Sequence, residues 1–329
     1  MKKFLKVLGF IAGGFVVILI AGLIYFNSAF PKVDPPTNIK IDPTPERIAR
    51  GEYLANHITV CMDCHSKRDW TKYSGPIISG TFGGGGDVFD ENVGFPGKVM
   101  VKNITPASIG NWNDGELIRA ITCGVTKDNR ALFPMMPYPN YNKLTQEDLY
   151  AIVAYVRSLK PIENKLPDTQ LNFPLNFIVK TMPIQSYSPM VINDNNPIEY
   201  GKYLVTIAGC KNCHSKSEKG EPLPGMEFAG GEEFPFPNGL VKSANITPEN
   251  ETGIGLWTKE LFLKRFKNYD NDSAKSVSVS ETDFNTPMPW TMYGGMTEED
   301  LSAIYDYLRT VKPIRNRVER FTPVNIVKK

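Results

Sequence analysis

Two short runs in the chain combine two cysteines and a histidine at a spacing that suits covalent attachment of haem. The runs are Cys61-Met62-Asp63-Cys64-His65 and Cys210-Lys211-Asn212-Cys213-His214. Two thiols at this spacing can form thioethers with the two vinyl groups of one porphyrin. The histidine that follows is then held beneath the iron as an axial ligand. The sequence therefore predicts two covalently bound c-type haems, one at each run.

Other uses of paired cysteines fit the sequence less well. A thioredoxin-type redox motif expects a strand–helix–strand context and no adjoining histidine. A zinc site would need more ligands than a chain with five cysteines and three histidines has left. The fifth cysteine, Cys123, has no counterpart near the second run, and we interpret it as a small buried residue. The alternative is that Cys123 is a distal thiolate ligand of one haem.

The second axial ligand of each iron follows by elimination. His65 and His214 are used, and His57, which we interpret as a structural or surface residue, is the one histidine left. Two bis-histidine haems are therefore impossible within one chain, and methionine is the usual alternative. Met136 and Met288 occur at matching places after the two histidines, and the proline after each favours an extended methionine backbone. The near competitors are Met135 and Met292.

Markers around the two runs indicate that the chain contains two copies of one unit. Each copy has Gly-x-Tyr-Leu before its cysteines, then Asn-Ile-Thr-Pro, then Met-Pro-aromatic, and finally a similar polar-capped apolar segment. In order, the markers lie at 51–54 and 201–204, 103–106 and 245–248, 136–138 and 288–290, and 144–149 and 296–301. A repeat this long is a duplicated domain and not a solenoid unit.

Capping signals predict an opening and a closing helix in each copy. The expected N-caps are Thr44 and Asn196 for the opening helices, each followed by proline, and Thr145 and Thr297 for the closing helices. Apolar residues at helical spacing follow these caps, and Pro161 and Pro313 stop the closing helices. We therefore predict an all-α fold of two tandem domains, 44–165 and 195–320, with loop-rich connections and a proline-rich linker at 166–194.

Glycine and tryptophan recur in both copies at places that suit close packing. Gly51 and Gly201 are expected to let an aromatic of the closing helix, Tyr155 or Tyr307, pack tightly across the opening helix. Trp112 and Trp257 follow Asn-Ile-Thr-Pro. Each either lies at a haem edge and donates its indole N–H to a propionate, or is an ordinary core aromatic.

The N-terminal segment, residues 1–30, is predicted to be a membrane anchor. Residues 7–26 are uncharged and almost wholly apolar, which is enough for a membrane-spanning helix. Lysines precede this stretch, so the remainder should cross to the non-cytoplasmic side. We expect a single-pass protein of the cell membrane, the inner membrane of a Gram-negative cell, with its haem domains in the periplasm. A cleaved signal peptide is the alternative. The net charge of +2 over 329 residues gives no indication of nucleic-acid binding.

Residues 44–320 resemble the class I cytochrome c superfamily. The stretch at 124–139 and the linker at 173–177 are more narrowly similar to the cytochrome subunits of bacterial membrane-bound alcohol, aldehyde and sugar dehydrogenases. The resemblance implies that His65 with Met136, and His214 with Met288, are the iron ligands. Those subunits typically carry three haem motifs and a C-terminal anchor, whereas this chain has two motifs and an N-terminal apolar segment.

These features predict an electron-transfer protein and not a catalyst. We expect single electrons to pass on the periplasmic side from a dehydrogenase or quinol-linked donor to a terminal acceptor. The expected partners are a dehydrogenase subunit, a quinol-oxidising complex or a terminal oxidase. The alternative is a dihaem enzyme, a peroxidase or a thiosulfate dehydrogenase-like oxidoreductase. That alternative needs an open or thiolate-bound haem face, and Cys123 is the feature that favours it.

Overall fold

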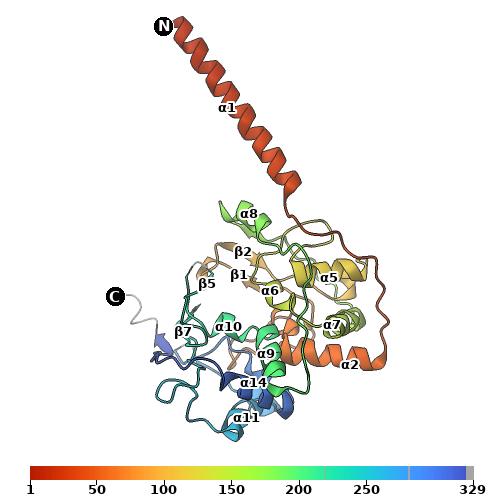
Figure 1. Cartoon of the computed structure of the whole chain (residues 1–329), viewed down its shortest axis with the longest axis vertical. Helices are drawn as coiled ribbons and strands as arrows, with labels where there is room; N and C mark the ends of the chain where they lie inside the picture. The colour runs from red at the N-terminus through yellow and green to blue at the C-terminus, as the bar shows by residue number, and fades with distance from the viewer. Residues whose placement is uncertain (219, 281, 324–329) are drawn as a thin grey trace.

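The computed structural model describes residues 1–218, 220–280 and 282–323. A long helix, α1 (Lys2–Ala29), stands apart from the rest of the chain, which lies below it (Figure 1). None of its residues is buried, and it is long and apolar enough to cross a membrane. A signal sequence passes the same test, so the anchor stays a prediction.

Each copy of the repeat is built from two crossing helices with shorter elements between them. The first copy contains α2 (Pro45–Tyr53), η1 (Leu54–Ile58), α3 (Cys61–Cys64), η2 (Glu91–Val93), α4 (Pro106–Ile109), α5 (Asp114–Cys123), α6 (Tyr138–Tyr141) and α7 (Gln146–Ser158). The second contains α9 (Pro197–Ile207), α10 (Cys210–Cys213), α11 (Lys259–Lys267), α12 (Asp272–Lys275), α13 (Trp290–Tyr293) and α14 (Glu298–Leu308). The linker carries α8 (Leu175–Ile178) and η3 (Val179–Thr181).

The predicted helix starts are confirmed. The hydroxyl of Thr145 accepts a hydrogen bond from the third backbone N–H of α7 at 3.3 Å, and Thr297 does the same for α14 at 3.1 Å. Helices α2 and α9 each begin with proline after a capping side chain, Thr44 or Asn196. These local polar contacts satisfy N–H groups that have no partner inside a helix.

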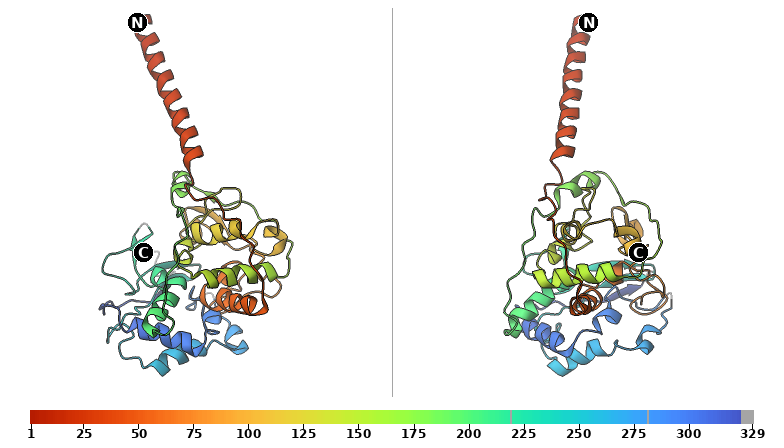
Figure 2. Two further views of the ribbon diagram at one scale, coloured as in Figure 1. Left: turned by 45° about the vertical axis from the view of Figure 1, so that its right-hand side comes forward. Right: turned by 90° about the vertical axis from the view of Figure 1, so that its right-hand side faces the viewer.

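The close crossing of opening and closing helices depends on one glycine in each copy. Figure 1 and Figure 2 show α2 crossing α7. A Cβ at Gly51 would lie 1.9 Å from the carbonyl oxygen of Ala151, and one at Gly201 would lie 1.9 Å from that of Ala303. The Cβ of the tyrosine one turn further along each closing helix would be only 2.8 Å or 3.0 Å away. Any side chain would push the helices apart, so the predicted packing role of these glycines is confirmed.

The path from the opening helix to the cysteines differs between the copies by one residue. The segment from Gly51 to Cys61 is one residue longer than the segment from Gly201 to Cys210. The first copy forms a π-helical turn, Leu54–Ile58, where α9 continues as a regular α-helix. A π turn absorbs a single insertion while the helix goes on, so the extra residue does not disturb the attachment run.

The expectation of an all-α body is met only in part, because three small antiparallel sheets lie between the helices. They are β1 (Val88–Phe89), β2 (Gly97–Met100) and β3 (Gln170–Leu171); β4 (Ser217–Glu218) and β5 (Glu221–Pro222); and β6 (Glu233–Phe236), β7 (Gly239–Lys242) and β8 (Phe321–Pro323). Val88 pairs with Met100 and Phe234 with Val241. Strands this short have too few residues to alternate visibly, so periodicity could not predict them.

The two copies pack against each other through an exchanged pair of hydrogen bonds. The Tyr203 hydroxyl of α9 donates to Oδ2 of Asp148 on α7 at 2.6 Å. The Tyr53 hydroxyl of α2 donates to Oδ2 of Asp300 on α14 at 2.5 Å. Each hydroxyl also accepts from the N–H of the N-cap residue of that helix, at 3.1 Å and 3.0 Å. The tyrosine of each Gly-x-Tyr-Leu marker therefore caps the closing helix of the other copy.

Candidate haem sites

A cavity of about 810 Å³ lies beside the first cysteine run. Its lining includes four of the predicted site residues, Cys61, Cys64, His65 and Met136. Most of the remaining wall is apolar, with Ile104, Trp112, Leu117, Ile152 and Val156 among its members. Cofactor pockets of this kind have volumes of roughly 300–1,000 Å³ and few polar groups. The residues present therefore fit a covalently attached porphyrin.

The histidine of each run is held with one ring nitrogen ready to bind a metal. Nδ1 of His65 lies 2.7 Å from the carbonyl oxygen of Lys102, and Nδ1 of His214 lies 2.7 Å from that of Ala244. A carbonyl only accepts, so Nδ1–H is the donor and Nε2 keeps its lone pair. Burial lowers the pKa of both imidazoles, which favours the neutral form that a metal ligand requires.

Met136 and Met288 occupy the same kind of turn. In both, the N–H two residues further on donates to the methionine carbonyl, at 2.7 Å and 2.8 Å. The intervening prolines then begin α6 and α13 with closely similar backbone angles, φ −79° with ψ 52° and φ −80° with ψ 64°. Met135 lines the first cavity together with Met136. The matched turns support the pairing made from the sequence, whereas proximity to the cavity does not separate Met136 from Met135.

His57 lies at the contact between the two copies. Its Nδ1 is 2.7 Å from the carbonyl oxygen of Met292 on α13, so this nitrogen carries the proton. A Cβ at Gly295 would lie 2.2 Å from the ring, which shows how closely the imidazole packs on that glycine. The same contacts place Met292 against the neighbouring copy. Both residues have packing roles here, as interpreted for His57 from the sequence.

Cys123 is buried at the end of α5. Ala120 and Ile121, on the same helix, line the first cavity, whereas Cys123 is not among the described residues that line it. Burial raises the pKa of its thiol, which disfavours the thiolate. This placement gives no support to a distal thiolate ligand. Trp112 lines the cavity, and both Trp112 and Trp257 pack against the hydrophobic core.

Two glycines that the sequence pattern did not indicate hold the histidine loops. The N–H of Gly85 donates to the carbonyl of His65 at 2.8 Å, and that of Gly230 donates to His214 at 2.7 Å. Both glycines have positive φ, 65° and 73°. A Cβ on either would lie 2.5 Å from the backbone carbon whose carbonyl binds the histidine ring. Glycine is needed at both places so that the two loops can approach.

The repeated Asn-Ile-Thr-Pro ties each site to the segment after the closing helix. Nδ2 of Asn103 donates to the carbonyl of Ile162 at 2.7 Å, and Nδ2 of Asn245 donates to that of Ile314 at 2.8 Å. The partner segments share the pattern Lys-Pro-Ile-x-Asn, at 160–164 and 312–316. This further repeat was a readable signal, and it could have predicted which loops meet.

Two contacts join the sites across the copies. Oγ of Ser74, in the loop after the first run, donates to the carbonyl of Met288 at 2.6 Å and accepts from the N–H of Trp290 at 3.0 Å. Asn140 of α6 and Asn212 of the second run exchange side-chain hydrogen bonds at 3.0 Å and 3.3 Å. The methionine loop of the second copy therefore contacts the loop that follows the first cysteine run. The helix after the methionine loop of the first copy contacts the second cysteine run.

Known proteins similar to this chain are cytochromes and cytochrome subunits. Residues 198–312 match the family model described as cytochrome c. The fructose dehydrogenase cytochrome subunit of Gluconobacter japonicus is 29% identical over 84% of this chain and 56% of that protein. The cytochrome c subunit of the quinone alcohol dehydrogenase of Gluconobacter oxydans is 26% identical over 81% of this chain and 55% of its own length. A diheme cytochrome c-type protein of Cereibacter sphaeroides is 26% identical over 77% of this chain and 82% of its own length.

This chain spans about half the length of the two dehydrogenase subunits, 56% and 55%. The family match covers the second attachment run, and the alignments with the subunits extend over most of the chain. Residues 198–312 are therefore similar to the cytochrome c family, and over most of its length the chain is similar to the cytochrome c subunits of dehydrogenases.

Proposed function

We propose that this chain is a dihaem electron-transfer protein with one haem c in each copy of the repeat. The thioethers would form at Cys61 and Cys64 and at Cys210 and Cys213. The axial ligand pairs would be His65 with Met136 and His214 with Met288. The observation that carries the proposal is the repeated geometry, in which both histidines have the same donor nitrogen and both methionines the same turn.

The bound haem supplies reversible one-electron chemistry, and the chain controls access to it. With histidine and methionine on both faces, the iron offers no position for a substrate. The apolar wall of the first cavity, including Leu117 and Ile152, would keep water away from a bound haem. Lys165 lines the same cavity and would provide positive charge for the acidic propionates.

We further propose that electrons pass between the two haems inside the chain. The Asn140–Asn212 contact joins the methionine loop of the first copy to the cysteine run of the second. The Tyr141 and Tyr293 hydroxyls lie close to the cysteine runs and donate to the carbonyls of Thr59 and Ala208. Packing both attachment runs at one interface shortens the distance that an electron must cross.

A dehydrogenase is the electron donor that we propose. The relatives are named as subunits of fructose, alcohol and gluconate dehydrogenases. A quinol-linked donor is the alternative, and a terminal oxidase is one possible acceptor. We place this exchange on the periplasmic side of the membrane, with α1 as the anchor, because its basic flank precedes the apolar segment. Mild-detergent purification from native membranes should recover a dehydrogenase subunit with the chain.

The electron-transfer proposal is tested by a redox titration of the purified full-length holoprotein. It should take up two electrons per chain, and its reduced haems should not bind carbon monoxide, because both axial positions are occupied. The Met136→Ala variant is the positive control, since it should open one haem to carbon monoxide. Uptake of one electron, or carbon monoxide binding by the unaltered protein, would contradict the proposal.

A further inference from the structure

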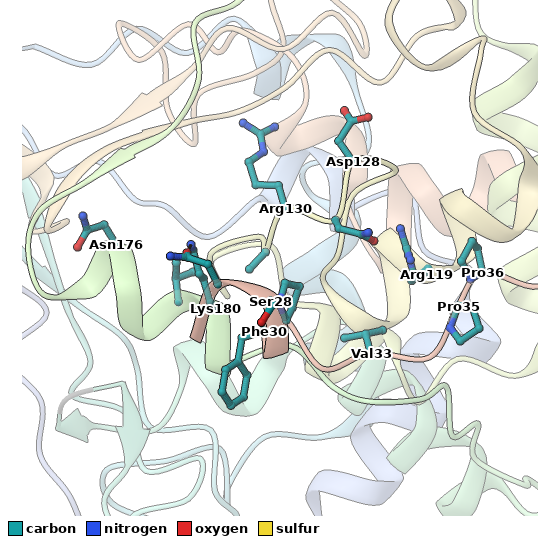
Figure 3. Close-up of a pocket in the computed structure, with 15 residues that line it drawn as sticks. Ser28, Phe30, Val33, Pro35, Pro36, Arg119, Asp128, Arg130, Asn176 and Lys180 are labelled. Carbon is teal, nitrogen blue, oxygen red and sulfur yellow. Dashed lines mark hydrogen bonds between the residues drawn. The ribbon is translucent and has the colours of Figure 1, made fainter. Parts of the chain in front are cut away.

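A second cavity, of about 790 Å³, lies where α1 joins the rest of the chain (Figure 3). Its wall includes Ser28 and Phe30 at the end of α1, and Arg119 and Lys180 from the body below. Figure 3 shows Lys180 close to Ser28. The cavity adjoins the first haem cavity and shares Arg130 with it, but Arg119 and Lys180 line only the second.

Arg119 is the feature of this cavity that points to a ligand. The residue is only 8% exposed, yet its charged group contacts no carboxylate among the ion pairs of the described residues. One terminal nitrogen donates to the carbonyls of Thr126 and Lys127, at 2.7 Å and 3.3 Å. Its Nε has no hydrogen-bond partner within the described part of the chain. A buried guanidinium without a counter-charge is costly, so an anion is expected beside it.

The other charges that line the cavity leave it positive. Lys180 donates to the side-chain oxygen of Asn27 at the end of α1 and has no carboxylate partner among the described residues. Arg130 is paired with Asp168 at 2.5 Å. Asp128 is the one carboxylate among the described lining residues. Arg119 and Lys180 are therefore the two cations available to a bound anion.

Apolar side chains around α8 indicate that this end of the body faces lipid. Phe173 is 80% exposed and Ile178 is 45% exposed. The ring of Phe177 packs against that of Phe26 of α1, with centroids 6.4 Å apart. Exposed apolar groups beside a membrane-spanning helix belong at the level of the lipid headgroups, where basic residues also bind anionic lipid.

We propose that this cavity binds the phosphate of an anionic phospholipid from the adjacent leaflet. Arg119 would hold the phosphate, and Lys180, which Figure 3 shows at the other side of the cavity near Ser28, would donate to other oxygens of the same lipid. Phe30 and Val33 would lie against its apolar part. The proposal rests on the membrane anchoring of the proposed function, and it assigns the cavity a role beyond electron transfer. A soluble phosphate shares the same chemistry, so the experiment must distinguish the two sources.

The test is native mass spectrometry of the full-length holoprotein in detergent, titrated separately with phosphatidylglycerol, phosphatidylcholine and glycerol 3-phosphate. Phosphatidylglycerol should bind one per chain and more tightly than the other two. Arg119→Gln and Lys180→Gln should each weaken it by about ten-fold or more, because each removes a charge-assisted hydrogen bond. Lys32→Gln is the matched control, since exposed Lys32 follows α1 but does not line the cavity.

Three results would overturn the proposal. They are equal binding of phosphatidylcholine, an equal loss of lipid in Lys32→Gln, and glycerol 3-phosphate binding as tightly as the lipid. The haem spectrum recorded on each sample separates this failure from failure of the proposed function. If Arg119→Gln does not fold, Lys180→Gln decides the result, because its side chain is only half-buried.

Discussion

The methionine loops of the two repeats are supported in different ways. The Met288 loop is held from outside its own copy, because Ser74 of the first copy bonds on either side of it. The cavity that contains Met136 is instead closed by the linker, with Leu171 and Val179 in its wall. The two copies share the proposed ligand types and the turns, while the packing around them differs. The second site should therefore depend on the first copy more than the first site depends on the second.

The two tyrosines that bond across the copies, Tyr53 and Tyr203, also have unequal surroundings. Asp148, which accepts from Tyr203, also receives two hydrogen bonds from Arg50, at 2.9 Å and 3.2 Å. Asp300, which accepts from Tyr53, has no ion-pair partner among the residues that the structure describes. Both carboxylates are buried, and a buried charge with fewer partners is more sensitive to the loss of one.

Loss of a methionine ligand should produce the largest spectral change, and it should distinguish the two haems from each other. Met136→Ala should remove the iron–thioether absorption band from one haem, and Met288→Ala should remove it from the other. The haem that loses its methionine should also have a lower reduction potential, because thioether ligation favours ferrous iron. Spectroelectrochemistry of both variants measures this. A change of both haems by one substitution would break the assignment of one site to each copy.

The tyrosine pair should show a smaller but unequal effect on stability. Tyr53→Phe should lower the free energy of unfolding by about 2–3 kcal/mol, because it removes the hydroxyl that donates to the buried Asp300 at 2.5 Å. Tyr203→Phe should cost only about 1 kcal/mol, because Arg50 still bonds to Asp148. Denaturant unfolding of the holoprotein gives both values. Equal effects would mean that the two halves of the interface are equivalent.

Ser74→Ala should have the smallest effect, confined to the second site. Loss of its hydrogen bonds to the Met288 loop should lower the free energy of unfolding by about 1 kcal/mol and make the methionine loop more mobile. The second haem should then lose its thioether band at a lower temperature than in the unaltered protein, while the first should not change. Thr71→Ala is the control, since this exposed residue lies in the same loop. An equal shift of both haems would indicate general destabilisation.

Local signals predicted the helix starts well, because caps and prolines act over a few residues. They could not predict contacts between distant segments. The partner of Tyr53 lies 247 residues away, and Ser74 bonds to a carbonyl 214 residues away. The short strands could not be predicted for the same reason, because β3 and β8 form by pairing with strands far earlier in the chain. The Lys-Pro-Ile-x-Asn repeat, in contrast, is visible in the sequence and indicates which loops meet.

Two covalent haems per chain can be tested most directly by the intact mass of the denatured holoprotein. The mass should exceed that of the polypeptide by two haems. Peptide mapping should find one haem on the fragment with Cys61 and Cys64, and one on the fragment with Cys210 and Cys213. A mass increase of a single haem, or haem that dissociates on denaturation, would contradict the presence of two equivalent attachment sites.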